Sequence, residues 1–201
     1  MFKSIKHNAS AEIVEKKSKF IANIFYIESK EEAENLIKDI NKKYHDARHN
    51  CYAYRVITSD GIIEKASDDG EPSGTAGAPM LNILSKNELV NVLVVVTRYF
   101  GGILLGTGGL VKAYSSACAL GLEKSEIIEK NIAQVYKIEI GYTDIDKFKY
   151  FAKNNNIIIL NEEYLENVIL EIGIKEENLL KNISQKEINV RNIEFIKEIY
   201  V

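Results

Sequence analysis

The chain lacks the residues and segments that mark several classes of protein. Among its 201 residues it has no tryptophan, two prolines and two cysteines. The cysteines, Cys51 and Cys118, are too far apart for a metal or redox motif. No run reaches the roughly 18 apolar residues of a membrane-spanning helix, and residues 1–20 contain no continuous apolar segment typical of a secretory signal. We therefore expect a cytoplasmic protein in a reducing environment, with no membrane association.

The chain also lacks a large excess of charge of either sign. Its formal net charge is −3 at pH 7. Residues 1–132 carry as many basic as acidic side chains, and the acidic excess lies in residues 133–201. Non-specific binding of nucleic acid depends on neutralising many phosphates with Lys and Arg. The composition therefore counts against such binding and is compatible only with a local basic patch.

Hydrophobic periodicity predicts an α+β fold of two domains, residues 1–132 and residues 133–201. In the first domain, Ser29 and Glu32 form a capping box at the start of a helix. The unbroken β-branched run VNVLVVVTRYF indicates a buried strand, and the turn signal SDG joins two further strands into a hairpin. The expected strands are 18–27, 51–57, 62–68 and 90–100, and the expected helices are 29–44, a short helix ending at 80–87, and 110–124.

The second domain is expected to have the order βαββαβ of a ferredoxin-like fold. Its hairpin turn is placed near Glu162 and Glu163. This part of the chain has no cluster of chemically reactive residues, so we expect the functional site in the first domain. The expected elements are a strand at 133–142, a helix at 143–155, strands at 157–164 and 165–174, a helix at 175–186 and a strand at 188–201.

The first cluster of reactive residues is HDARHNCYAYR, residues 45–55, here called the histidine cluster. If the preceding helix continued through it, His45 and His49 would share a helix face and could bind a metal. No HExxH glutamate and no third ligand are evident, so we expect no metal site. The histidines would instead cap a helix end or donate hydrogen bonds in a cleft. A nucleophilic pair of Cys51 and His49 is a further alternative.

The second cluster is SDDGEPSGTAGAP, residues 67–79, here called the acidic loop. Its three carboxylates, Asp68, Asp69 and Glu71, could hold a hydrated magnesium ion. They could equally favour the start of the short helix that follows, with Ser73 or Thr75 as its N-cap residue. On the physics of the sequence, the capping interpretation is favoured.

The third cluster is RYFGGILLGTGGL, residues 98–110, here called the glycine turn. It is not a Walker A loop, because Thr107 occupies the lysine position, and it is not a dinucleotide loop, because Val111 replaces the third glycine. Residues 106–109 still open a helix whose free N–H groups would accept an anion. Arg98 and Tyr99 would add charge and a stacking surface. The alternative is that the glycines only allow close packing of strand and helix.

Together the three clusters resemble the IMPACT/YigZ family. The resemblance is carried by HDARHNCYAYR, DDGEPSGTAGAPML and VVTRYFGGILLGTGGLVKAY, which occur in this order within residues 15–125. It implies that the first domain resembles the second domain of a small-subunit ribosomal protein and domain IV of elongation factor G. It also implies that the second domain resembles the ferredoxin-like C-terminal domain of elongation factor G. Both comparisons imply contact with RNA or the ribosome.

We therefore expect a non-enzymatic RNA- or ribosome-associated protein, acting as a translation-related regulator, as a monomer or weak homo-oligomer without cofactors. Alternatives are a magnesium-dependent enzyme acting on a nucleotide or phosphorylated small molecule, and an adaptor for a protein partner. Catalytic residues are not identifiable. The residues expected to line an RNA or ligand cleft are His45, Arg48, His49, Tyr52, Arg55, Asp68, Asp69, Glu71, Ser73, Thr75, Arg98, Tyr99, Gly101, Gly102, Gly106, Thr107, Gly108, Gly109 and Lys112.

Overall fold

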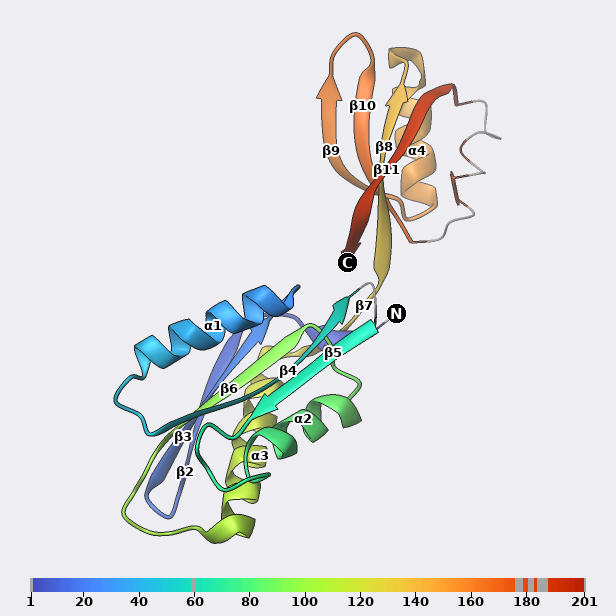
Figure 1. The fold of residues 1–201 in the computed structure, drawn as a ribbon. Coiled ribbons are helices and arrows are strands. Elements are labelled where there is room, and N and C mark those ends of the chain that lie inside the picture. Colours follow the sequence, from blue (N-terminus) through green and yellow to red (C-terminus); the bar gives the residue numbers. More distant parts are fainter. Residues whose placement is uncertain (1, 59–60, 176–178, 181–182, 184–187, 201) are drawn as a thin grey trace. The chain divides into compact units, whose positions relative to one another are not determined.

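The computed structural model describes residues 2–58, 61–175, 179–180, 183 and 188–200. The chain separates into two compact units, the first unit being Phe2–Glu129 and the second unit Lys130–Val201 (Figure 1). Within the described residues no helix is long and apolar enough to cross a lipid bilayer.

The first unit is built on a five-stranded antiparallel sheet with the strand order β2-β3-β6-β4-β5. The strands are β2 Ala9–Glu15, β3 Ser18–Tyr26, β4 His49–Thr58, β5 Gly61–Ser67 and β6 Val92–Tyr99. Strand β6 is central, and every residue before its last one is buried. The buried strand expected from the β-branched run is thus confirmed.

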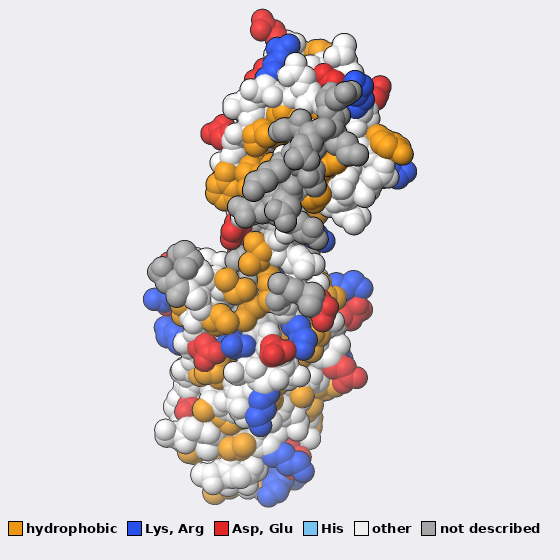
Figure 2. Space-filling view, turned by 90° about the vertical axis from the view of Figure 1, so that its right-hand side faces the viewer, with side chains coloured by type: hydrophobic (Ala, Val, Ile, Leu, Met, Phe, Trp, Pro, Cys, Tyr) orange, Lys and Arg blue, Asp and Glu red, His pale blue; other side chains and the backbone are white. Residues whose placement is uncertain are grey.

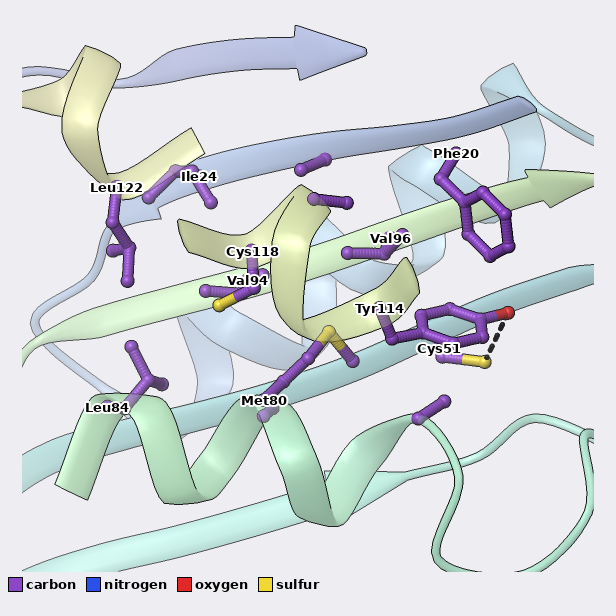
Figure 3. Close-up of a cluster of buried hydrophobic side chains, with 14 of the residues drawn as sticks. Phe20, Ile24, Cys51, Met80, Leu84, Val94, Val96, Tyr114, Cys118 and Leu122 are labelled. Carbon is purple, nitrogen blue, oxygen red and sulfur yellow. Dashed lines mark hydrogen bonds between the residues drawn. The ribbon is translucent and has the colours of Figure 1, made fainter. Parts of the chain in front are cut away.

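Helices cover both faces of this sheet. Helix α1 (Lys30–Lys43) lies on one face, whereas α2 (Gly77–Lys86) and α3 (Gly106–Ser125) lie on the other (Figure 1). The core between the sheet and the pair α2–α3 includes Phe20, Met80, Tyr114 and Cys118 (Figure 3). Burial of each large apolar side chain contributes about 1.5–3 kcal/mol. This core holds the end of β6 and the start of α3 in place, and the candidate site lies there.

Helix α1 begins as its sequence predicts. The backbone N–H of Glu32 donates to the hydroxyl oxygen of Ser29 at 3.0 Å. The Glu32 carboxylate accepts a hydrogen bond from the N–H of Glu28 at 2.8 Å, one residue before the cap. Ala33 and Ile40 are buried against the sheet, so the helix packs on it through an apolar face.

Two features of the first unit differ from the sequence prediction. Helix α3 begins at Gly106, so residues 106–109, which were expected to open a helix, form its first turn and extend the helical range expected at 110–124. Strands β1 (Phe2–Ile5) and β2 were not predicted. The partner of β1, β7 (Ile127–Lys130), lies far away in the chain, whereas β2 forms a hairpin with β3 but has mostly exposed or half-buried residues. The predicted hairpin of β4 and β5 is present, but residues 59–60 of its SDG turn lie outside the described residues.

The second unit contains a four-stranded antiparallel sheet with the order β11-β8-β10-β9. Phe148 and Phe151 of α4 pack into its core. Most of the predicted helix at 175–186 lies outside the described residues. The elements are β8 Ile132–Ile140, a 3₁₀ turn η1 at Tyr142–Asp144, α4 Ile145–Asn154, β9 Ile158–Tyr164, β10 Val168–Ile174 and β11 Val190–Tyr200.

The hairpin turn of the second unit was placed wrongly. Tyr164 pairs with Val168, so the turn falls after Tyr164 and not near Glu162 and Glu163. Glu162 remains on the strand, where its carboxylate accepts a hydrogen bond from Lys149 of α4 at 2.7 Å. The acidic residue Glu162, which suggested a turn, therefore forms an ion pair between strand β9 and helix α4.

Candidate functional site

The three sequence clusters meet at one pocket of the first unit, with a volume of about 440 Å³. The histidine cluster contributes Arg48 and the first residue of β4, His49. The acidic loop contributes residues 70–72, and the glycine turn joins β6 to α3 (Figure 1). The pocket is lined by Arg48, His49, Gly70, Glu71, Pro72, Arg98, Phe100, Leu104, Leu105, Gly106, Thr107 and Leu110.

A buried ion pair forms the floor of the pocket. The guanidinium Nη1 of Arg98 lies 2.6 Å from Oε1 of Glu71, and the two side chains are 8% and 3% exposed. The hydroxyl of Tyr114 donates to the same carboxylate oxygen at 2.9 Å. The rings of Phe20 and Phe100 lie 5.5 and 5.6 Å from the guanidinium carbon of Arg98. These contacts fix the position of the guanidinium group.

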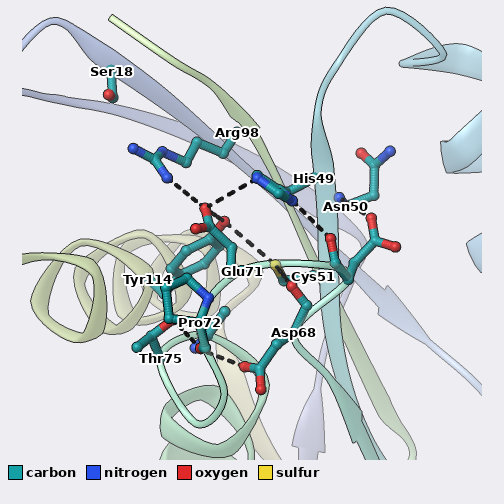
Figure 4. Close-up of polar contacts among 12 residues, drawn as sticks. Ser18, His49, Asn50, Cys51, Asp68, Glu71, Pro72, Thr75, Arg98 and Tyr114 are labelled. Carbon is teal, nitrogen blue, oxygen red and sulfur yellow. Dashed lines mark hydrogen bonds and ion pairs between the residues drawn. The ribbon is translucent and has the colours of Figure 1, made fainter. Parts of the chain in front are cut away.

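His49 stands beside this pair at the start of β4. Its Nδ1 lies 2.7 Å from the backbone carbonyl oxygen of Asp69. A carbonyl oxygen only accepts, so Nδ1 carries the hydrogen of this bond. Its Nε2 lies 3.9 Å from Oε1 of Glu71 (Figure 4). The imidazole is therefore oriented by the acidic loop, with its second nitrogen directed at the ion pair.

The start of α3 forms another wall of the pocket. Leu105 is the N-cap residue, no side chain caps the helix, and its first turn contains no acidic residue. Gly106 has a φ of +74°, and a Cβ added at Gly108 would meet nothing within 4 Å. The N-terminal turn of a helix presents N–H groups without helical partners and a partial positive charge. This wall therefore suits an anion.

The acidic loop does not gather its carboxylates as a magnesium site requires. Asp68 accepts hydrogen bonds from the N–H groups of Gly74, Ala76 and Gly77 at 2.8, 2.9 and 2.8 Å. The Asp69 carboxylate accepts one from the N–H of Asn50 at 2.7 Å, and that of Glu71 faces Arg98. The described part of the chain contains no group of three or more His, Cys, Asp or Glu residues placed to hold a metal.

Asp68 performs the helix capping that we expected from Ser73 or Thr75. Ala76 is the N-cap residue of α2 without a side-chain bond of its own. The Thr75 hydroxyl instead donates to the carbonyl of Pro72 at 2.6 Å, and Ser73 is exposed. Burial acts to raise the pKa of the Asp68 carboxyl, but the three backbone hydrogen bonds outweigh it and lower the pKa below its ordinary value.

The helix-face arrangement considered for the histidine cluster is absent. Helix α1 ends at Lys43, so His45 lies in an exposed turn outside the pocket lining and His49 begins a strand. The Cys51 thiol lies 2.9 Å from the carbonyl oxygen of Asp68. Burial raises the pKa of Cys51 to about 12. The nucleophilic pair of Cys51 and His49 is therefore contradicted, because the thiol remains protonated at neutral pH.

Two other residues of the predicted cleft, Tyr52 and Arg55, lie away from the pocket. Tyr52 and Tyr54 face α1, on the opposite side of the sheet from Cys51. Arg55 donates to Glu64 at 2.7 Å and to the carbonyl of Leu89 at 2.9 Å, so it is engaged in structural contacts. Strands alternate the faces of successive side chains, which explains why Tyr52 points away from the pocket. Arg55 is on the same face of β4 as Cys51 and is separated from the pocket by its distance along the strand.

The remaining predicted residues surround the pocket or shape the glycine turn. The Tyr99 hydroxyl donates to Asp46 at 2.7 Å. A Cβ at Gly101 would lie 2.0 Å from the backbone of Lys17, so this glycine serves close packing. Gly102 has a φ of +85°. Other predicted residues that the pocket lining does not include are Gly108, Gly109 and Lys112, all on α3.

Apolar residues of the pocket were missed by the sequence analysis. Phe100 and Leu104 are 49% and 82% exposed and belong to the pocket lining. Pro72 and Leu105 also line it, and Tyr114 holds the ion pair from α3. For Leu104, the signal available in the sequence was the apolar stretch between two glycine pairs, because an apolar side chain exposed in a turn suits a binding surface.

Known proteins share both parts of the chain. Residues 16–122 match the Impact N-terminal domain, and residues 138–181 match a domain of unknown function, DUF1949. The chain is 39% identical to the IMPACT family member YvyE of Bacillus subtilis over 87% of this chain and 80% of that protein. It is 34% identical to the IMPACT family member YigZ of Escherichia coli over 79% of this chain and 78% of that protein.

A solved structure extends the likeness to the whole fold. The crystal structure of a hypothetical protein aligns with a TM-score of 0.64 at 28% identity and covers 98% of this chain and 97% of that chain. The two-domain fold is therefore shared. With the matched domain and the relatives above, these findings establish that the chain belongs to the IMPACT family.

Proposed function

We propose that this IMPACT family member is a non-enzymatic RNA- or ribosome-associated protein with a role in regulating translation. We place its RNA contact at the pocket of the first unit. One observation carries the proposal: three clusters far apart in the sequence converge on a single pocket with Arg48, Arg98 and the start of α3. The strand order β11-β8-β10-β9 supports a ferredoxin-like second domain, as the resemblance to elongation factor G implies.

The pocket offers the two kinds of contact that single-stranded RNA uses. Arg48 is exposed at its rim, and the N–H groups of Gly106 and Thr107 lie at the start of α3. Phe100 and Leu104 supply an exposed apolar surface. Stacking of a base on an aromatic side chain contributes about 1–3 kcal/mol. The stacking role that we expected of Tyr99 is therefore assigned to Phe100.

The charge distribution limits the proposed RNA contact to a small part of the surface. Figure 2 shows basic and acidic side chains interspersed on the face of the first unit that it displays, and the net charge of the chain is −3. Each neutralised phosphate of a single strand contributes a slope of about −0.7 to log K against log salt. We expect a total slope of about −1 to −2, which corresponds to two or three phosphates held at one place.

The alternative of a magnesium-dependent enzyme is disfavoured, because the three carboxylates proposed as magnesium ligands are engaged in other contacts. Asp68, Asp69 and Glu71 bind a helix start, a strand N–H and an arginine, each in a different direction. The Cys51 thiol is buried and protonated, so it adds no nucleophile. The geometry therefore favours binding over catalysis by these residues.

Fluorescence anisotropy of labelled single-stranded RNA over a salt series tests the proposal, together with co-sedimentation with ribosomes. Replacing the exposed Arg48 by Ala should weaken RNA binding about fivefold. The matched control is Lys38→Ala, which removes one positive charge from an exposed position on α1. Absence of binding to both RNA and ribosomes at low salt, or equal loss in the two variants, would exclude the proposed role of the pocket.

A further inference from the structure

Arg98 carries a hydrogen-bond donor that has no acceptor among the described residues. Its Nε is buried and unpartnered, although Nη1 is bound to Glu71 at 2.6 Å. An unsatisfied buried N–H group is unfavourable, so a working state with an acceptor at this position is expected. Figure 4 shows Nη1 directed at Glu71 and the other terminal nitrogen directed away from it. The free edge of a guanidinium group matches two oxygens of a phosphate.

The start of α3 provides an independent set of donors in the same pocket. In the first unit, α1 is capped by Ser29 and α2 by Asp68. Helix α3 has neither a side-chain cap nor an acidic residue in its first turn. Gly106 and Thr107 of this turn line the pocket together with Arg98. An oxygen near this turn would gain hydrogen bonds from N–H groups and the favourable field of the helix.

The number and depth of these donors distinguish between kinds of phosphate. The free edge of Arg98 offers donors for two oxygens, and the α3 turn offers donors for a third. A terminal phosphomonoester has three free oxygens, whereas a phosphodiester within a strand has two and carries a nucleoside on each side. Arg98 is only 7% exposed, so the phosphate must enter the pocket, which a chain end does more easily. Phe100 is the one Phe, Tyr or Trp among the described lining residues, which suits a single nucleoside.

Building on the proposed function, we propose that the pocket recognises the phosphorylated end of single-stranded RNA. The terminal phosphomonoester lies between the free edge of Arg98 and the first turn of α3. The attached nucleoside packs against Phe100 and Leu104. Glu71 is the one carboxylate among the described lining residues and is bound to Arg98. Because it binds Nη1, it holds the guanidinium group in place and leaves the opposite edge for the phosphate.

Competition binding with oligonucleotides of one sequence tests the proposal on the full chain. Three RNAs carry a 5′-phosphate, a 3′-phosphate or hydroxyl groups at both ends, and AMP is the mononucleotide competitor. We expect at least one phosphorylated end to bind about tenfold more tightly than the hydroxyl ends, and AMP to compete for it. The two phosphorylated RNAs identify which end is read.

Variants at Gly108 and Arg98 test the α3 donors and the guanidinium donors separately. A helical side chain lies over the turn N-terminal to its own Cα, so the carboxylate of G108E would cover the start of α3. We expect G108E to lose the preference for phosphorylated ends and G108Q to retain part of it. R98K keeps the positive charge beside Glu71 but lacks the two-pronged edge, so it should also lose the preference. Lys112→Gln, on the same helix outside the pocket lining, is the matched control and should keep it.

The outcomes separate this inference from the proposed function. Equal affinity for all three RNAs overturns the end recognition but leaves RNA association standing. Absence of RNA binding with retained binding of AMP overturns both. The inference would also be overturned if G108E and R98K both fold and both keep the wild-type preference for phosphorylated ends. Thermal unfolding of each variant verifies that the compared proteins are folded.

Discussion

The Asp68 carboxylate caps helix α2 from six to nine positions away in the sequence. It accepts hydrogen bonds from the backbone N–H groups of Gly74, Ala76 and Gly77. Replacing it by Asn removes the charge but keeps one acceptor, and should lower the free energy of unfolding by about 1 kcal/mol at pH 7. Since the folded pKa of Asp68 lies below its ordinary 3.8, the contribution is complete above that pH and is lost as the pH falls through the folded pKa.

Urea unfolding of the wild type and Asp68→Asn at pH 7 and near pH 3 checks this prediction. The difference between the two proteins should shrink in acid. Asp39→Asn is the control, because Asp39 is exposed and 3.5 Å from Lys42. A difference that stays constant with pH would show that the charge of Asp68 is not what stabilises α2.

The two cysteines should be inert in the folded protein. Burial raises the pKa of Cys51 and of Cys118 to about 12, and the thiolate is the reactive form. At pH 8 we expect the reaction with a disulfide reagent to be limited by opening of the structure, and both thiols to react at once in denaturant. Rapid stoichiometric labelling of the native protein would contradict this reading of their burial.

At the scale of elements, the glycine turn contains glycines with opposite structural demands. A Cβ at Gly101 would lie 2.0 Å from the backbone of Lys17, whereas one at Gly108 meets nothing within 4 Å. Gly101→Ala should therefore destabilise the fold by about 2–3 kcal/mol through overpacking. Gly108→Ala should stabilise it by up to about 1 kcal/mol, since Ala favours a helix. Thermal melts of the two variants should shift in opposite directions, and a shift of the same sign would refute the contrast.

How much the sequence predicted depends on the range of the contacts involved. Helix α1 was predicted with its cap because Ser29, Glu32 and the apolar face lie within a few turns of one another. Strand β1 was missed because it pairs with the distant β7, and β2, although it forms a hairpin with β3, was missed because its mostly exposed or half-buried residues give little periodic signal. The candidate pocket was only partly predicted: the clusters were identified, but the direction of Arg55 depends on a carbonyl of Leu89, which adjacency in the sequence does not reveal.

At the scale of the whole molecule, the chain consists of two units with separate hydrophobic cores. The cores of the first unit draw on residues up to Leu122, and that of the second begins at Tyr136. All residues that line the pocket belong to the first unit. A unit that has its own core is expected to fold alone. The proposed RNA contact should therefore not require the second unit for its geometry.

Expression of residues 1–131 alone tests this expectation and keeps β7, which pairs with β1. We expect the fragment to unfold cooperatively, to retain the far-ultraviolet signal of its helices, and to bind phosphorylated RNA within about twofold of the full chain, because a self-contained unit keeps its own site. Calorimetry of the full chain should resolve two transitions, one of which coincides with that of the fragment. A folded fragment that binds RNA more than tenfold more weakly than the full chain would place part of the RNA contact in the second unit and would limit the pocket to a share of the binding surface.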